Sequence, residues 1–208
     1  MAYGEFTPAQ AAAVTGLSVA AVYRAIDTGL VRPRVAKAGG SVRRFLSTAQ
    51  LVYLQLEAGG LRLLPLPARQ EVAVRIEGAP DAAWIAVGGG QALRVEVKAA
   101  RKKVATELQR LAKAEAMACS DAAIMSGAPV FRGTRIPIQL VADMLVQGAS
   151  PEEILEGYPS LNKETIALAP VYVRAFPRRG RPVRRPWADQ RPTLTTTHRL
   201  GQRGRRVA

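Results

Sequence analysis

The chain has 208 residues and a formal net charge of +14, with 30 Lys and Arg against 16 Asp and Glu. A basic balance of this size favours nucleic acid, an acidic protein or an anionic membrane surface as partner. The single cysteine, Cys119, excludes an internal disulfide, and the single histidine, His198, leaves neither a zinc site nor a Ser/His/Asp set. We therefore expect a protein that is not an enzyme and that has no catalytic residues, metal or cofactor.

No apolar run approaches the roughly 18 residues that span a bilayer. The first residues show no basic stretch followed by an apolar one, so we expect a cytoplasmic protein with no membrane partner. Residues 177–208 hold ten Arg and one Asp, which is +9 of the +14. The patterns predict an α+β chain in four parts, which are residues 1–58, 59–118, 119–175 and 176–208.

Residues 1–58 have the pattern of a winged helix-turn-helix. Thr7 and Pro8 begin one helix, Ser18 caps a second that runs to Thr28, and Gly16 lies in the turn between them. The sequence predicts two short strands that flank Gly39-Gly40 and would form the wing. Ser47-Thr48 then caps a helix with Leu51, Leu54 and Leu56.

This module resembles the winged helix-turn-helix of MerR-type regulators, although the long coiled-coil helix of that family does not follow. The matching residues are Ala12, Thr15, Gly16, Leu17, Ser18, Tyr23, Arg24, Gly29, Leu30, Pro33, Arg43, Arg44, Phe45 and Leu46. In such a fold the second helix can enter a major groove and the wing can contact the phosphates. The candidate DNA-binding residues are Ser18, Tyr23, Arg24, Lys37, Arg43 and Arg44. The alternative is an ordinary solvated helix face and hairpin.

Residues 59–118 predict a small strand-rich region with one helix. Two prolines in Leu61–Pro67 disfavour regular structure there, and Val72, Val74 and Ile76 alternate as in a strand, as do Leu93, Val95 and Val97. Residues 83–87 form a third apolar run. Ala99 to Met117 has the spacing of an amphipathic helix, with Val104, Leu108 and Leu111 on one stripe. A three-stranded sheet is small, so we expect this region to pair with a second copy in a homodimer.

Residues 119–175 predict a small hairpin followed by three short helices that form a helix-turn-helix unit. The hairpin would pair residues 123–125 with 129–131 across Ser126-Gly127. Pro137 begins a helix that Gly148 ends, Ser150 and Glu153 form a capping box, and Asn162 caps a third helix. Pro170 is expected to end or kink that helix.

This stretch resembles the domain of unknown function 433 family. The matching residues are Gly127, Pro129, Gly133, Thr134, Arg135, Ile136, Pro137, Gly148, Ser150, Glu152, Glu153, Ile154, Leu155, Tyr158, Pro159 and Leu161. Proteins of that family commonly look like VapB-type antitoxins encoded beside a PIN-domain ribonuclease toxin. The resemblance therefore implies such a toxin and operator DNA as partners.

A second DNA or dimer surface could include Arg132, Arg135, Asn162 and Lys163. The four glutamates nearby make it more acidic than a phosphate-binding face should be, which favours dimerisation or positioning of the tail. Arg132 and Arg135 could bind phosphate or pair with nearby acids to hold the turn. The acidic residues are Glu152, Glu153, Glu156 and Glu164.

Residues 176–208 are rich in arginine and proline and have too few aliphatic residues to fold alone. Their first part resembles the segment that follows the domain in such antitoxins. An arginine delivered into the carboxylate cluster of a PIN nuclease could neutralise or displace its metal while Trp187 fills a nearby groove. The alternatives are non-specific binding of DNA or RNA and a merely solvated flexible run. The candidate toxin-binding residues are Arg178, Arg179, Arg181, Arg184, Arg185 and Trp187.

The sequence thus predicts an antitoxin of a type II toxin–antitoxin system that represses its own operon through the N-terminal module. It would neutralise a PIN-type ribonuclease through its tail. The alternative is a MerR-like transcription regulator with no toxin partner, whose middle region senses a small ligand. An RNA-binding or scaffold protein is a third class.

Overall fold

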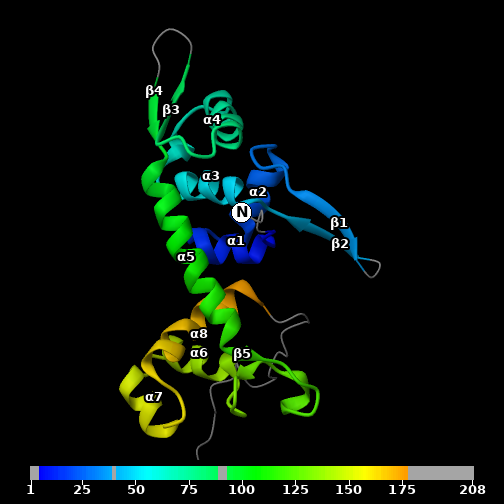
Figure 1. Ribbon diagram of the computed structural model, residues 1–208, viewed down its shortest axis with the longest axis vertical. Coiled ribbons are helices and arrows are strands. Elements are labelled where there is room, and N and C mark those ends of the chain that lie inside the picture. Colours follow the sequence, from blue (N-terminus) through cyan, green and yellow to red (C-terminus); the bar gives the residue numbers. More distant parts are fainter. Residues whose placement is uncertain (1–4, 39–40, 89–92, 178–208) are drawn as a thin grey trace, which may run out of the picture. The chain divides into compact units, whose positions relative to one another are not determined.

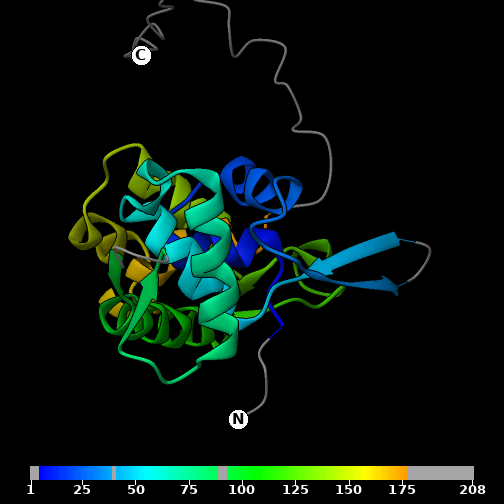
Figure 2. The ribbon, with the colours of Figure 1, turned by 90° about the horizontal axis from the view of Figure 1, so that it is seen from above.

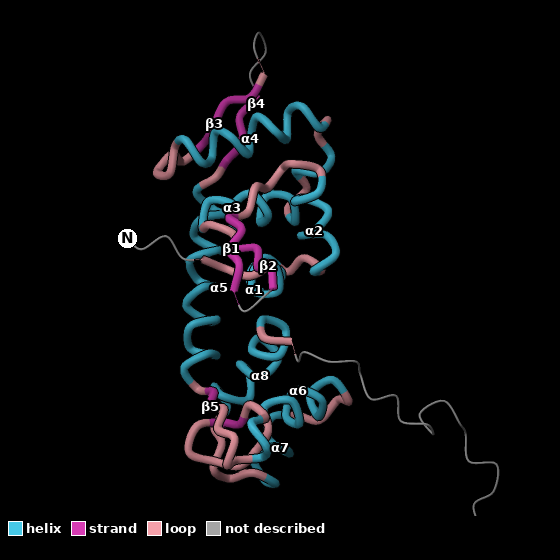
Figure 3. Tube along the Cα trace, turned by 90° about the vertical axis from the view of Figure 1, so that its right-hand side faces the viewer, coloured by secondary structure: helices cyan, strands magenta, loops and turns pink. Residues whose placement is uncertain are grey.

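The computed structural model describes residues 5–38, 41–88 and 93–177. Helices and three separate two-stranded antiparallel sheets make up this part of the chain (Figures 1 and 3). The coarse expectation of a mixed α+β chain is confirmed. The described residues form one compact unit.

The N-terminal elements follow the predicted order. Thr7 caps α1 with a capping box, Ser18 caps α2, and Ser47 caps α3 with a second capping box. Figure 2 shows the β1–β2 hairpin extending away from these helices. The elements are α1 (Pro8–Thr15), α2 (Val19–Asp27), β1 (Arg34–Ala38), β2 (Ser41–Phe45) and α3 (Thr48–Ala58).

The middle region differs from the prediction of three strands and one helix. Residues 66–78 are a helix, in which Val72 and Ile76 are fully buried while Val74 is exposed. A strand would place all three side chains on one face, whereas positions four apart share a helical face. Pro67 lies in the first turn of this helix, where its missing N–H costs nothing. The elements are the 3-10 turn η1 (Leu61–Leu63), α4 (Leu66–Gly78), β3 (Trp84–Val87), β4 (Leu93–Glu96) and α5 (Lys98–Ala116).

The predicted amphipathic helix is confirmed as α5. Val104 and Leu111 are buried, and Leu108 is partly buried against the same core. That core also takes side chains from α1, α2, α3, α4 and β3, so α5 contributes a long wall to the N-terminal module.

The C-terminal region contains the three predicted helices but a different hairpin. Residues 118–119 pair with residues 130–131, and residues 125–127 form a 3-10 turn instead of a strand. The capping boxes at Ser150 and Asn162 are confirmed. Pro170 does not end the last helix, which continues to Ala175. The elements are β5 (Ala118–Cys119), η2 (Met125–Gly127), β6 (Val130–Phe131), α6 (Ile138–Val146), α7 (Pro151–Gly157) and α8 (Lys163–Ala175).

A second core lies among α6, α7, α8 and β6, around Phe131, Ile138, Ile154 and Ile166. The end of α8 leaves this core and joins the first one. Ala175 is buried there with Phe176 packed alongside, and the Arg174 guanidinium donates to the Ala12 carbonyl in α1 at 3.3 Å. The last described residues therefore lie against the N-terminal module.

Candidate nucleic-acid interface

The first two helices meet at a sharp angle. Their axes are bent by 115° across residues 16–18. Gly16 has φ 75°, a left-handed conformation that glycine adopts without steric cost, and it ends α1. The Ser18 hydroxyl then accepts the Ala21 backbone N–H at 3.1 Å and begins α2. Ser18, which the sequence predicted to contact DNA, thus serves as a helix cap and is itself exposed.

Helix α2 separates its buried and exposed faces clearly. Val22 and Ala25 are buried in the N-terminal core, whereas Tyr23 and Arg24 are exposed. Packing of Val22 and Ala25 therefore fixes the orientation of α2, and its exposed side presents the Tyr23 hydroxyl and the Arg24 guanidinium to solvent.

The strand register divides the hairpin into two faces. Val35 lies opposite Arg44, and Lys37 lies opposite Val42. Because directly paired residues share a face and successive residues alternate, these four side chains lie together. We call Val35, Lys37, Val42 and Arg44 the cationic hairpin face; all four residues are exposed. The Arg44 guanidinium lies 5.7 Å from the centre of the Tyr23 ring, which joins this face to α2.

Arg43 lies on the other face of the hairpin, opposite Ala36. It is exposed, but the structure does not bring it together with Lys37 and Arg44. At the base of this second face Arg34 pairs with Glu5 and stacks 5.7 Å from the Phe45 ring centre. The sequence alone did not separate the two arginines of the wing, although strand alternation could have done so.

A partly buried ion pair that the sequence did not predict joins α3 to α4. Glu57 of α3 accepts two hydrogen bonds from Arg69 of α4, at 2.8 and 3.0 Å, and one from the Tyr53 hydroxyl. Burial raises the pKa of Tyr53 well above the usual range, and the hydrogen bonds to Glu57 raise the pKa of Arg69. The spacing of Tyr53 and Glu57 by four residues was the available sequence signal. This network fixes α3 to α4.

The proposed second surface in the C-terminal region uses most of its polar groups internally. Arg132 donates to the carbonyls of Ala116 and Ala118 at 2.9 and 3.0 Å, which holds the end of α5. These hydrogen bonds go to backbone carbonyls, whereas the sequence suggested phosphate or a nearby acid as the partner. Arg135 is exposed beside a recess of about 440 Å³.

Asn162 and Lys163 also make local contacts. The Asn162 side chain accepts the Thr165 N–H at 2.8 Å, and Lys163 pairs with Glu152 at 2.7 Å. These two residues therefore stabilise the start of α8 and its junction with α7.

The six candidate toxin-binding residues lie outside the described residues. Within the described ranges, no group of three His, Cys, Asp or Glu side chains could hold a metal ion. In the same ranges, no single helix is both long enough and apolar enough to cross a membrane.

Residues 120–173 match the family model described as a protein of unknown function, DUF433. The chain is also similar to the uncharacterized protein y4eO of Sinorhizobium fredii, with 39% identity over 89 residues. That alignment covers 43% of this chain and 40% of the relative, so the chain matches less than half of the relative's length. No solved structure shows significant similarity to this chain. The similarity to the DUF433 family is thus confined to the C-terminal region, residues 120–173.

Proposed function

We propose that the N-terminal module binds duplex DNA, with α2 in the major groove and the cationic hairpin face on the adjoining phosphates. The Arg44 guanidinium lies over the Tyr23 ring, which puts one cation of the hairpin beside the exposed side of α2 and supports this docking. The 115° bend between α1 and α2 also falls in the range of helix-turn-helix units, about 90–120°.

The chemistry of the two elements suits different parts of the duplex. A helix of about 10 Å diameter fits a major groove roughly 12 Å wide, and Arg24 can donate to base edges there. Lys37 and Arg44 can neutralise phosphates, which positions the module without reading sequence. Val35 and Val42 give the same face apolar contact area against the sugars.

The test is binding to a labelled duplex from the region upstream of the protein's own reading frame, followed by fluorescence anisotropy. Replacement of Arg24 by Ala removes a base or phosphate contact and should weaken binding by about tenfold. Arg75→Ala is the matched control, because Arg75 is an exposed arginine on α4 that pairs with Glu71. Equal affinities for the two variants would overturn the proposed docking.

We further propose that DNA binding serves a VapB-type antitoxin, which represses its operon and neutralises a PIN-domain ribonuclease. The resemblance of residues 119–175 to a family in which VapB-type antitoxins are common, and the cationic composition of residues 177–208, support this role. Ala175 and Phe176 pack in the core that includes α1, so a toxin held by the residues that follow would be tethered to the DNA-binding module. Binding of the two partners would then be coupled through avidity.

This second part is tested by co-expression with the product of the adjacent gene. We expect the two proteins to copurify, and a chain that ends at Pro177 to lose the partner while it still binds DNA. The truncation keeps Phe176 because that residue belongs to the core. DNA binding without any retained protein would favour a MerR-like regulator that has no toxin partner.

A further inference from the structure

The β3–β4 hairpin carries an exposed tryptophan on its outward face. Ile85 and Val87 of β3 are buried in the N-terminal core. Because successive residues of a strand point to opposite faces, Trp84 points away from that core, and it is 46% exposed. Tryptophan is highly buried on average, and on protein surfaces it is enriched in interfaces. The exposure of Trp84 therefore indicates a contact surface on this face of the hairpin.

Arg94 lies on the same face and stacks on Trp84. Its guanidinium carbon is 4.2 Å from the centre of the indole ring. Arg94 is exposed and forms no salt bridge among the described residues, Glu96 on the same face included. A guanidinium is planar and keeps its N–H donors at its edge while its face stacks. Trp84 and Arg94, which we call the stacked pair, thus offer a cationic plane on which another flat group can lie.

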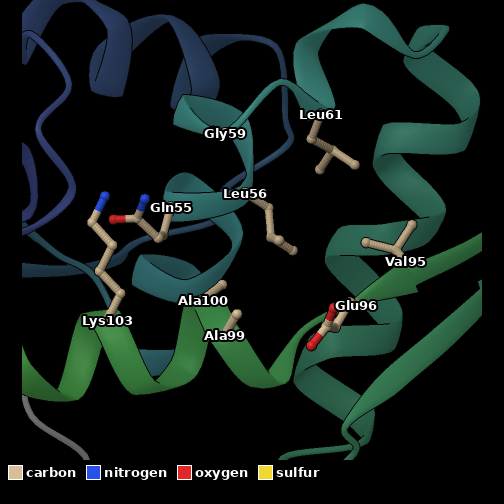
Figure 4. A pocket seen from close by; sticks show the side chains of 9 residues that line it. All are labelled: Gln55, Leu56, Gly59, Leu61, Val95, Glu96, Ala99, Ala100 and Lys103. Atoms are coloured by element: carbon tan, nitrogen blue, oxygen red, sulfur yellow. The ribbon is translucent and has the colours of Figure 1, made fainter.

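Helix α5 begins next to the stacked pair and carries two lysines there. The Lys98 N–H donates to the Ala83 carbonyl at 3.0 Å, which places the start of α5 beside Trp84. Lys98 and Lys102 are exposed, and in the described ranges neither forms a salt bridge. Like charges four residues apart destabilise a helix slightly, so helix stability does not account for the two lysines. Lys103 extends toward α3 instead and is not part of this surface (Figure 4).

A stacking plane beside free ammonium groups suits nucleic acid better than an acidic protein. An acidic protein would pair with the lysines but would leave the stacked pair without a flat partner. The bases of a duplex stack on one another, whereas the bases of a single strand can stack on aromatic and arginine side chains. A single strand therefore satisfies both parts of the surface.

We propose that the stacked pair and the two lysines bind single-stranded nucleic acid. A base stacks on Arg94 and Trp84, and neighbouring phosphates pair with the Lys98 and Lys102 ammonium groups. These contacts go to the faces of bases and to phosphates, so the surface has little sequence preference. The site uses no residue of the proposed duplex interface and does not depend on that function.

The fluorescence of Trp84 reports on stacking directly. The chain has two tryptophans, so the titration uses the full-length Trp187→Phe variant. An oligouridylate of about twelve nucleotides, within the usual range of site sizes, should quench Trp84 saturably. A blunt duplex of the same length should not. A parallel titration with oligothymidylate shows whether RNA or DNA is the tighter single strand.

Matched variants of the full chain test each contact by the anisotropy of a labelled oligouridylate. Trp84→Ala should weaken binding by about tenfold. Leu93→Ala, at a 45% exposed position on the other face of the hairpin, should not. Lys102→Ala should reduce the slope of log K against log salt by about 0.7, the value for one phosphate of a single strand. Lys113→Ala is its control, because Lys113 lies further along α5 and pairs with Glu164.

Three results would overturn the proposal. The first is binding of the oligouridylate without a change in Trp84 fluorescence, and the second is equal affinity of Trp84→Ala and Leu93→Ala. The third is loss of the Trp84 quenching when polyglutamate of equal charge is added, which would show a general acceptor of anions. Arg24→Ala should leave the quenching unchanged, so failure of this site is distinguishable from failure of the duplex interface.

Discussion

At the scale of single residues, the cost of burying a charge is clearest at Glu57, whose carboxylate needs its neighbours to compensate for lost solvation. It is 9% exposed and carries a carboxylate that Arg69 and Tyr53 both donate to. A buried charge that loses its partner keeps its desolvation penalty and loses the attraction that compensated for it. The intact network therefore adds little net stability, but its disruption would leave the Glu57 carboxylate buried without a cation.

Arg69→Met should lower the free energy of unfolding by about 3 kcal/mol, since it leaves Glu57 buried without its cation. Arg75→Met on the same helix should cost less than about 1 kcal/mol, because the Arg75–Glu71 pair is largely exposed. Urea denaturation of both variants measures the difference. Similar losses for the two would show that Glu57 is solvated in solution, and recovery in the double variant Glu57→Gln, Arg69→Met would support the burial argument.

Glu153 has a pH dependence that can be assigned in sign. Hydrogen bonds from the backbone N–H and hydroxyl of Ser150 lower its pKa below the ordinary value of 4.5. A lowered pKa in the folded state stabilises the protein at pH values above 4.5, and this contribution is lost as the pH falls through the folded-state value. Melting of the wild type and Glu153→Gln should therefore differ most near neutral pH and converge in acid. A constant difference across the acid range would contradict the capping geometry.

At the scale of elements, caps and turns were the features that the sequence predicted best. Thr7, Ser18, Ser150 and Asn162 all cap the helices assigned to them, because side-chain acceptors for free N–H groups act locally. Helix α4 was missed because apolar residues at 72, 74 and 76 satisfy both a strand and part of a helix. Only tertiary packing, which buries Ala68 and Ala73 partly and exposes Val74, decides between them.

The turn between α1 and α2 depends on one backbone conformation. Gly16→Ala should destabilise the protein by about 1 kcal/mol, since an L-residue pays that cost in the left-handed region. An added methyl group meets no atom within 4 Å there, so the cost is conformational. Gly78→Ala, at the end of α4 and equally open, should instead stabilise by up to about 0.5 kcal/mol. Thermal melts compare the two; a neutral Gly16→Ala would refute the argument.

At the scale of the whole molecule, the sequence predicted the order of the N-terminal elements and the C-terminal domain but not how they join. The buried position of Ala175 and the bond from Arg174 to α1 link segments about 160 residues apart, and no local pattern encodes such a contact. The candidate site was predicted as a set of residues. The strand register shows that the hairpin residues of this set lie on two faces, with Arg43 on one and Arg44 on the other.

If α2 and the cationic hairpin face bind DNA together, the salt dependence of binding depends on the charges of that face. Anisotropy titrations at several salt concentrations give the slope of log K against log salt for the wild type, Arg44→Ala and Arg43→Ala. Arg44→Ala should reduce the slope by about 0.9, the value for one phosphate contact, while Arg43→Ala should leave it near the wild-type value. Equal slopes for Arg44→Ala and the wild type, or the larger loss in Arg43→Ala, would show that the cationic hairpin face does not lie on the phosphates.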